Sequence, residues 1–209
     1  MRRLLFFLAA LSMVSTGCAK KVKVTIDGTV SPTQTTLYLI INEDTANAQR
    51  LPIKDARFSV TVTVDRDAFI RLHDWKDWPE RSVFVLIPDS RHITIDWNKG
   101  TIEGSPQSQK LQAACRQIRD LSPEGFHIDV FTDDPEAWRE ARERGNSIRN
   151  SMLAQQKDVA KRVMMENKDN ISVVWIAYRF PQLLEGELNA MIDHMKPKWA
   201  NHPLLNKRK

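Results

Sequence analysis

The sequence is short of cysteine and glycine, with two Cys and seven Gly in 209 residues. Two cysteines exclude a disulfide-rich scaffold and a multi-cysteine zinc module. The few glycines form no phosphate-binding loop, and neither a Gly-x-Ser-x-Gly elbow nor a His-Glu-x-x-His helix occurs. The five histidines include no His-x-His or His-x-x-x-His pair, the spacings that would place two metal ligands together. We therefore expect a protein without enzymatic activity, cofactor or metal.

The sequence also has no strong excess of one charge. It contains 31 Lys and Arg and 26 Asp and Glu, which gives a net charge of +5. Basic and acidic residues balance within residues 18–104, and the later excess comes from Lys207, Arg208 and Lys209. No folded segment is strongly basic, so nucleic acid is not an expected partner. Hydrophobic residues make up 42% and charged residues 27%, which excludes a disordered chain or a polytopic membrane protein.

One long apolar run is present near the amino terminus, where residues 4–14 follow Arg2 and Arg3. A helix of that length spans about 16 Å, which is short of the roughly 30 Å hydrocarbon core of a bilayer. A basic start, a short apolar stretch and then small residues are typical of a secretory signal that is removed. We predict that residues 1–17 are such a signal.

Small residues directly before Cys18 resemble the lipobox of bacterial lipoproteins, although Ser15 stands where that motif usually has Leu. The resemblance implies cleavage before Cys18, lipid attachment to this cysteine and a stable membrane tether, since two or more acyl chains hold a protein on a bilayer. Ala19 follows instead of Asp, which in this family implies the outer membrane, and we expect the periplasmic side. The alternative is an ordinary secreted protein cut after Gly17 or Ala19.

Residues 18–104 have the period-two alternation of β-strands. The predicted strands cover residues 22–27, 37–41, 58–64, 83–87 and 92–97. These short segments are rich in β-branched residues and are separated by turn residues such as Pro88 and Gly100, a pattern that indicates antiparallel hairpins. We expect an antiparallel β-sandwich or open barrel.

Residues 105–209 change to the 3.6-residue period of helices. Four apolar faces are predicted: Leu111, Ala114, Cys115 and Ile118; Trp138, Ala141, Gly145, Ile148, Met152, Val159 and Val163; Ile171, Val174, Trp175 and Tyr178; and Leu184, Leu188, Met191 and Met195. The second helix is expected to start at Pro135, because proline suits the first helical position, and the fourth to end before Pro197. Strands followed by helices predict the α+β class.

Several segments resemble a known family in their order along the chain. They are the step at Gly104-Ser105, the segment Glu166-Asn167-Lys168-Asp169-Asn170, then Glu187-Leu188, Pro197 and His202-Pro203-Leu204. This arrangement resembles the uncharacterised domain (domain of unknown function family 4369) that precedes a thioredoxin-like domain in many envelope lipoproteins.

The thioredoxin-like domain of that family carries Cys-x-x-Cys, and this sequence has none. The resemblance therefore implies the non-catalytic portion, and a dithiol mechanism is excluded. One hypothesis that follows is a partnership with a thioredoxin-like protein on a separate chain.

The densest group of unusual residues is His73-Asp74-Trp75-Lys76-Asp77-Trp78. His73, Trp75, Asp77 and Trp78 are a candidate surface for a sugar, a peptide or a protein partner, because aromatic side chains beside carboxylates supply stacking and hydrogen bonds. The alternative is a hairpin loop whose tryptophans fold back onto the edge of the sheet. An unfamiliar enzyme site around His73 and Asp77 is a further hypothesis.

Cys115 shares its predicted helix face with apolar residues, which predicts a buried and inert thiol. Asp133 and Asp134 precede a helix, where carboxylates stabilise the amino-terminal end, so they need no catalytic role. Taken together, the sequence predicts a lipid-anchored, non-enzymatic binding or adaptor module of the cell envelope, with the membrane and an envelope protein as its partners.

Overall fold

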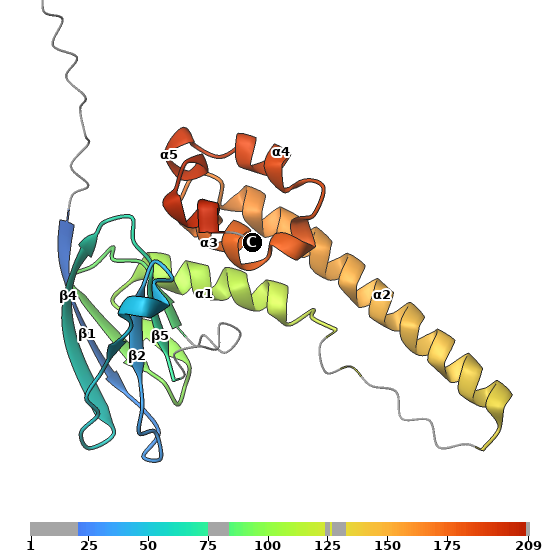
Figure 1. The fold of residues 1–209 in the computed structure, drawn as a ribbon, viewed down its shortest axis with the longest axis horizontal. Coiled ribbons are helices and arrows are strands. Elements are labelled where there is room, and N and C mark those ends of the chain that lie inside the picture. Colours follow the sequence, from blue (N-terminus) through green and yellow to red (C-terminus); the bar gives the residue numbers. More distant parts are fainter. Residues whose placement is uncertain (1–20, 75–83, 124–125, 127–132, 208–209) are drawn as a thin grey trace, which may run out of the picture.

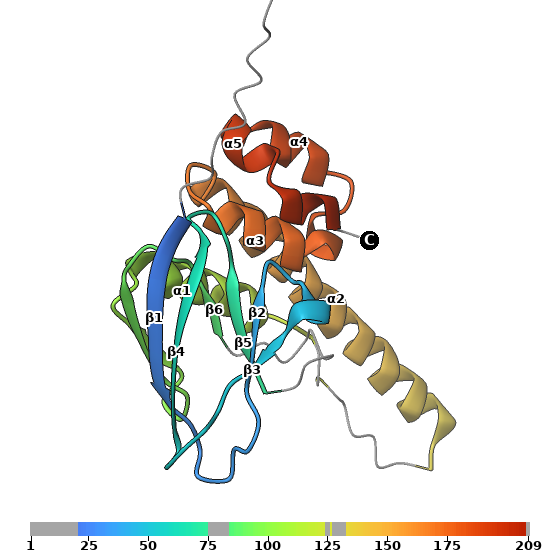
Figure 2. The same ribbon diagram turned by 60° about the vertical axis from the view of Figure 1, so that its left-hand side comes forward.

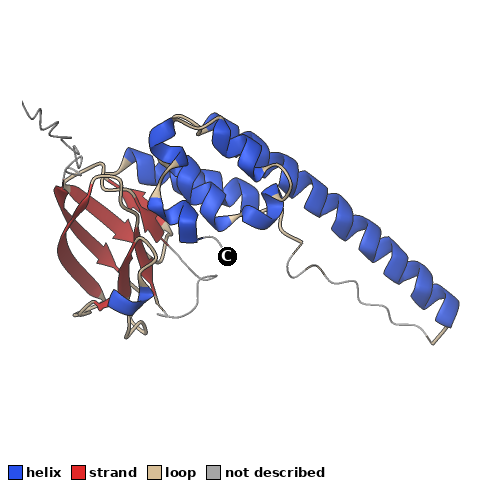
Figure 3. Ribbon diagram, turned by 45° about the horizontal axis from the view of Figure 1, so that its top comes forward, coloured by secondary structure: helices blue, strands red, loops and turns tan. Residues whose placement is uncertain are grey.

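The computed structural model describes residues 21–74, 84–123, 126 and 133–207. Within these residues the strands come first and the helices follow, so the predicted α+β class is confirmed (Figure 1). The change from strands to helices falls at Gly104 and Ser105, as the periodicity predicts. Figure 3 shows the strands gathered at one end of the molecule and the helices at the other.

The first sheet, here called sheet A, contains four strands in the order β4-β1-β7-β8. Their bounds are β1 Lys21–Thr29, β4 Arg57–Asp65, β7 His92–Asp96 and β8 Thr101–Glu103. β1 pairs antiparallel with β4 but parallel with β7. The prediction of purely antiparallel pairing was therefore wrong for β1 and β7. A parallel neighbour that comes much later in the chain leaves no local pattern in the sequence.

The second sheet, sheet B, has the order β3-β2-β5-β6 and is antiparallel throughout. Its strands are β2 Tyr38–Ile41, β3 Gln49–Arg50, β5 Ile70–His73 and β6 Phe84–Leu86. A short 3-10 turn, η1 Thr45–Asn47, separates β2 from β3. The two sheets face each other as a sandwich (Figure 2).

The space between the sheets holds the first hydrophobic core. Its strand residues include Val24, Ile26, Phe58, Val62, Val64, Leu39, Ile70, Leu72, Phe84, Leu86, Ile93, Ile95 and Ile102. Gly28 lies on this inward face of β1 opposite Phe58, and a side chain at Gly28 would overlap the Phe58 ring. The glycine therefore makes room for the aromatic side chain that closes this end of the core.

In the part of the chain that the structure describes, five α-helices and two 3-10 turns follow sheet A. They are α1 Pro106–Arg119, α2 Pro135–Glu166, α3 Ser172–Arg179, η3 Pro181–Leu184, α4 Leu188–Asp193, α5 Pro197–Ala200 and η4 Pro203–Lys207. Pro135 begins α2 as predicted, and Asp134 caps it by accepting a hydrogen bond from the Glu136 N–H at 2.9 Å. The fourth predicted helix is short, because Leu184 belongs to a separate 3-10 turn.

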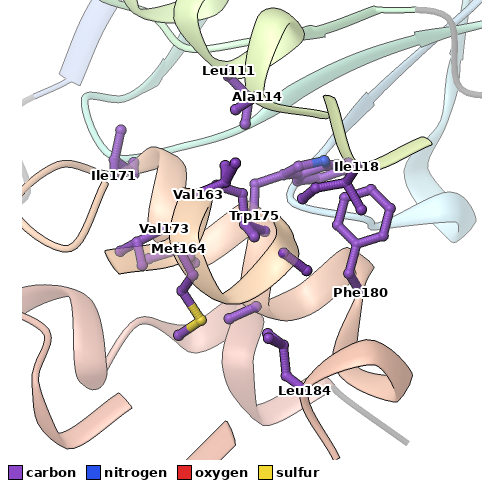
Figure 4. Close-up of a cluster of buried hydrophobic side chains, with 14 of the residues drawn as sticks. Leu111, Ala114, Ile118, Val163, Met164, Ile171, Val173, Trp175, Phe180 and Leu184 are labelled. Atoms are coloured by element: carbon purple, nitrogen blue, oxygen red, sulfur yellow. The ribbon is translucent and has the colours of Figure 1, made fainter. Parts of the chain in front are cut away.

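A second core lies among the helices (Figure 4). Phe69, just before β5, and Ile87, just after β6, join it from the side of sheet B. Leu111, Ala114 and Ile118 of α1 are buried in it, which confirms the first predicted helix face. α3 is buried on nearly every side, as expected of a helix in the centre of a helical layer. Phe69 extends from the start of β5 into the same core and packs on Trp175, with ring centroids 5.3 Å apart.

The start of α1 is fixed to the sandwich by hydrogen bonds. Ser105 caps the helix by accepting from the Ser108 N–H at 3.2 Å, and the Ile87 N–H donates to the Ser108 hydroxyl at 2.8 Å. Asp89 accepts from the Gln107 N–H at 2.8 Å. These bonds join the segment after β6 to the first turn of α1.

The carboxy-terminal segment is attached to the turn between β4 and β5. His202 Nε2 lies 2.9 Å from the carbonyl oxygen of Asp67, and Lys198 Nζ lies 2.7 Å from the Asp67 carboxylate. Lys207 Nζ donates to the Asn42 carbonyl at 2.8 Å. The last helices therefore pack back against the β-rich half.

The amino-terminal half of α2 extends away from the remaining elements (Figures 1 and 3). Buried residues occur only from Gln156 onward, while Trp138 is 46% and Ile148 is 40% exposed. The predicted apolar stripe is therefore buried only in the second half of the helix. The stripe has the period of an amphipathic helix, but among the described residues no element packs along that part of it.

Candidate binding site

A pocket of about 780 Å³, here named the sheet A pocket, lies on the outer face of sheet A. Strand register aligns eight of its lining residues in two rows that cross all four strands, and Gly28, Pro52, Lys54, Phe58 and Ile95 complete the lining. One row is Arg57, Thr29, Asp96 and Thr101, and the other is Ser59, Asp27, Thr94 and Glu103. Each row alternates hydroxyl and charged side chains across the sheet.

The alternation along each strand explains why these polar residues share a face. Ile26 and Ile95 point into the core, so that their neighbours Asp27, Thr94 and Asp96 must point outward. Adjacent strands lie about 4.8 Å apart, which brings polar groups of successive strands within reach of one small molecule.

The edge of the pocket beside β4 is basic. Lys54 and Arg57 lie there, joined by two backbone hydrogen bonds of 2.9 Å that close a tight turn. Asp55 and Ala56 form this turn with φ of 52° and 57°, a left-handed conformation seen in two-residue hairpin turns. The turn places both cations next to the two rows.

The centre and far side of the pocket are acidic. Asp27 Oδ2 lies 3.2 Å from His92 Nε2, just outside the lining residues. Asp96 accepts from the Lys99 backbone N–H at 3.0 Å, and this hydrogen bond is the main reason that its pKa is lowered. Asp96 is therefore ionised at neutral pH, as is expected of a carboxylate that accepts backbone hydrogen bonds.

The chemistry of the sheet A pocket suits binding. Its described lining contains neither Cys nor His, although the His92 imidazole lies close by, 3.2 Å from Asp27 Oδ2. Carboxylates can accept charge-assisted hydrogen bonds from an ammonium group, and the hydroxyls can donate to or accept from a polar ligand. Arg57 can bind a carboxylate or phosphate of the same ligand.

A second pocket of about 600 Å³ lies beside the first residues of β1 and is called here the basic pocket. Four cationic residues line it: Lys21, Lys23, Arg66 and Arg91. Asp89 is also in the lining, but its carboxylate accepts the hydrogen bond from Gln107 at the start of α1. The basic pocket is therefore suited to an anionic surface or group.

A buried ion pair lies between sheet B and the helices. Arg71 alternates with the core residues Ile70 and Leu72, so its side chain lies on the outer face of sheet B, where its Nε is 2.8 Å from Glu43 Oε1. Burial raises the pKa of Glu43, and it also raises the pKa of Tyr178, with the negative charge of Glu43 as the next cause. Both side chains of the ion pair are almost fully shielded, so it belongs to the interior of the fold.

The predicted surface around His73 is only partly within the described residues. His73 is fully buried, and its Nδ1 lies 3.4 Å from Asp74 Oδ1. Trp75, Asp77 and Trp78 lie outside the described residues, as does Cys18. The histidine therefore contributes to the interior, and the surface formed by the other three stays a prediction.

Cys115 is half-buried against the helical core. Burial raises the pKa of its thiol to about 12, although Arg119 and Arg179 act in the opposite direction. At neutral pH the group is a neutral thiol, which is a poor nucleophile. The predicted burial is therefore only partial, and the raised pKa supports the predicted lack of reactivity.

The sequence did not reveal the residues of the sheet A pocket. Asp27, Thr94 and Asp96 follow the polar half of an alternating pattern, which is the same for a solvated face and for a binding site. The missing signal was the register, because β1 and β7 are separated by more than sixty residues yet lie side by side. Only the pairing shows that these residues meet.

Comparisons with known proteins assign no class to the chain: no protein-family model, curated protein or solved structure matches it. The resemblance to the domain that precedes thioredoxin-like domains thus stays a prediction from its motifs. No group of three or more His, Cys, Asp or Glu residues in the described part of the chain could hold a metal ion. Among residues 21–74, 84–123 and 133–207, no helix is both long and apolar enough to span a bilayer.

Proposed function

We propose that this chain is a lipid-anchored protein of the cell envelope, tethered through Cys18 to the periplasmic side of the outer membrane, that binds a small polar ligand without transforming it. The sheet A pocket is its binding site, and the ligand carries an amino group. The observation that best supports this binding site is the pair of rows in which hydroxyls alternate with charged groups.

The charges of the pocket favour a ligand with an ammonium group. Asp27, Asp96 and Glu103 supply three carboxylates, whereas the cations Lys54 and Arg57 stand together at one edge. An ammonium near the carboxylates gains charge-assisted hydrogen bonds, and the neighbouring hydroxyls satisfy other polar groups. Amino sugars and short lysine-containing peptides both have this chemistry.

The basic pocket supports the membrane tether. Lys21 and Lys23 begin β1 only a few residues after Cys18, and Arg66 and Arg91 join them on the same end of the sandwich. Each cation close to an anionic bilayer surface contributes about 1 kcal/mol to attachment. A lipid at Cys18 would bring these cations close to the headgroups.

Titration calorimetry with a matched pair of sugars tests the ligand. We expect a chitosan tetrasaccharide, which carries protonated amines, to bind, and its fully N-acetylated counterpart to bind at least about tenfold more weakly. Asp27→Asn and Glu103→Gln should each weaken binding of the chitosan tetrasaccharide by about tenfold, whereas Glu140→Gln on the exposed part of α2 should not. Equal affinity for both sugars, or no binding of either, would contradict the proposed site.

Membrane fractionation tests the tether independently. The wild-type protein should sediment with membranes and carry acyl chains by mass spectrometry, and Cys18→Ser should release it. Cys115→Ser is the control, because this cysteine packs against the helical core and should leave attachment unchanged. An unacylated wild-type protein in the soluble fraction would overturn the anchor without affecting the ligand proposal.

A further inference from the structure

The outermost strand of sheet A, β4, lacks the features that usually protect an exposed edge. It is nine residues long, and residues 58–64 contain no charge, proline or glycine. Natural edge strands are commonly short or interrupted by lysine, proline or a bulge, because an open edge can pair with another chain. A long, uncharged and β-branched edge is therefore a surface that is suited to pairing.

The direction of the backbone hydrogen bonds shows which groups face outward. Arg57 exchanges both of its backbone hydrogen bonds with Lys54, on the side away from β1. Since the groups alternate along a strand, the N–H and C=O of Ser59, Thr61 and Thr63 point to the same outer side. Among the described residues, none of these groups takes part in a backbone hydrogen bond, and β1 occupies the opposite side.

We propose that two copies of this chain associate through antiparallel pairing of their β4 strands, which joins the two A sheets into one eight-stranded sheet. The stretch from Ser59 to Thr63 supplies the backbone groups of the interface. A two-fold axis near the middle of this stretch makes the interface self-complementary, as a symmetric dimer requires.

Charge complementarity between Arg57 and Asp65 favours a second copy as the occupant. One end of the edge carries Lys54 and Arg57 with Asp55 in the turn between them, and the other end carries Asp65, which is followed by Arg66. Antiparallel pairing places the cations of each copy beside Asp65 of the other, at both ends of the interface. In the described part of the chain, neither Arg57 nor Asp65 forms an ion pair, so both charges are available for this contact.

The side chains of β4 in one copy also suit those of β4 in the other copy. Ser59, Thr61 and Thr63 are exposed on the outer face, and Val60 is half-buried on the inner face. Across an antiparallel pair, hydroxyls meet hydroxyls and the central valines meet each other, both of which are favourable cross-strand pairs. A parallel arrangement would instead bring like charges together at each end.

Sedimentation velocity of the Cys18→Ser chain at about 1 to 100 µM tests the proposal. We expect a concentration-dependent dimer, weakened at least tenfold in Kd by Arg57→Asp and by Asp65→Arg. Each variant alone places like charges together, but an equimolar mixture of the two restores opposite charges at both ends. The mixture should therefore form a heterodimer. Arg50→Asp, on the edge strand of sheet B, is the matched control and should dimerise like the parent chain.

A backbone variant provides an independent test. Thr61→Pro removes an N–H that points to the outer side and keeps the backbone hydrogen bonds with β1, but it also removes the 3.0 Å hydroxyl hydrogen bond between Thr61 and Thr25. Edge strands tolerate proline at such a position. We expect this variant to keep the circular dichroism spectrum of the parent chain and to remain monomeric. A parent chain that is monomeric over the whole range would overturn the proposal, as would a dimer that persists in all three β4 variants.

Discussion

Glu43 Oε1 lies 2.8 Å from Arg71 Nε, in an ion pair whose side chains are only 8% and 2% exposed. Glu43 follows β2 with a φ of 57°, while Arg71 is in the middle of β5. The ion pair therefore links the residues just after β2 to the centre of β5, on the face of sheet B that the helices cover. A buried pair of this kind contributes little net stability when complete, but losing one partner is costly.

Arg71→Met should destabilise the protein by about 3–5 kcal/mol at pH 7, because it leaves the Glu43 carboxylate buried without its cation. Urea unfolding measures the change. The double variant Glu43→Gln with Arg71→Met should recover much of the loss, since no buried charge remains. A double variant as unstable as Arg71→Met alone would show that the arginine acts through packing and not through the ion pair.

The ion pair also predicts a pH dependence. Burial raises the pKa of Glu43 above its ordinary value of 4.5, so the folded protein holds this proton more tightly than the unfolded chain. Stability from this group is therefore fully present below pH 4.5 and falls as the pH rises through the folded pKa. Wild-type protein should lose more stability than Glu43→Gln between pH 4.5 and 7 in urea unfolding; an equal loss in both would contradict the raised pKa.

Cys115 should react slowly with Ellman's reagent in the folded protein. With its pKa raised to about 12, the thiolate fraction at pH 8 is about a thousandfold below that of an ordinary cysteine. The Cys18→Ser chain isolates this thiol, and the reaction rate with and without 6–8 M urea is the measurement. Equal rates in both conditions would mean that the folded structure does not suppress the thiolate.

Two isoleucine substitutions separate the projecting part of α2 from the helical core. Ile176→Ala should cost about 2–5 kcal/mol, because Ile176 is fully buried and its loss leaves a cavity. Ile148→Ala should change stability by less than about 0.5 kcal/mol, since Ile148 is 40% exposed. A large loss at Ile148 would show that the first half of α2 is covered in solution.

Two glycines with left-handed backbones form another matched pair. Gly104 has φ of 80° and Gly186 has φ of 82°, so alanine is strained at both by about 1 kcal/mol. At Gly104 the added Cβ would also lie 2.6 Å from the His92 carbonyl oxygen, whereas nothing lies within 4 Å at Gly186. Thermal unfolding should therefore show a clearly larger loss for Gly104→Ala. Equal losses would mean that the backbone at Gly104 yields without cost.

Elements with a regular pattern were predictable from sequence. The alternation in β1 and β4 and the face of α1 with Leu111 and Ile118 follow from burying one side of each element, so the local pattern carries the information. β5 was missed although its residues alternate, because it has only four of them. Ile70 and Leu72 fill the sandwich, whereas the polar residues Arg71 and His73 are buried on the other face of the sheet, where such residues are not expected from sequence.

The candidate site was harder to predict than the fold. Its two rows depend on the parallel pairing of β1 with β7 and on the turn that brings Lys54 beside Arg57. Neither contact has a signature within a short window of sequence. The projecting half of α2 has such a local signature but no packing partner. An apolar period identifies one face of a helix, and it does not determine which element packs on that face.

The central position of β1 affects how the protein would carry mechanical load. If Cys18 carries the proposed lipid, a tether just before Lys21 would pull on a strand held by β4 on one side and β7 on the other. Tension along that strand acts on both ladders in shear, so many hydrogen bonds must break together before it can slide. A force on the tethered domain would thus load the sheet in shear, the direction in which it resists best. It would not peel β1 away from one end.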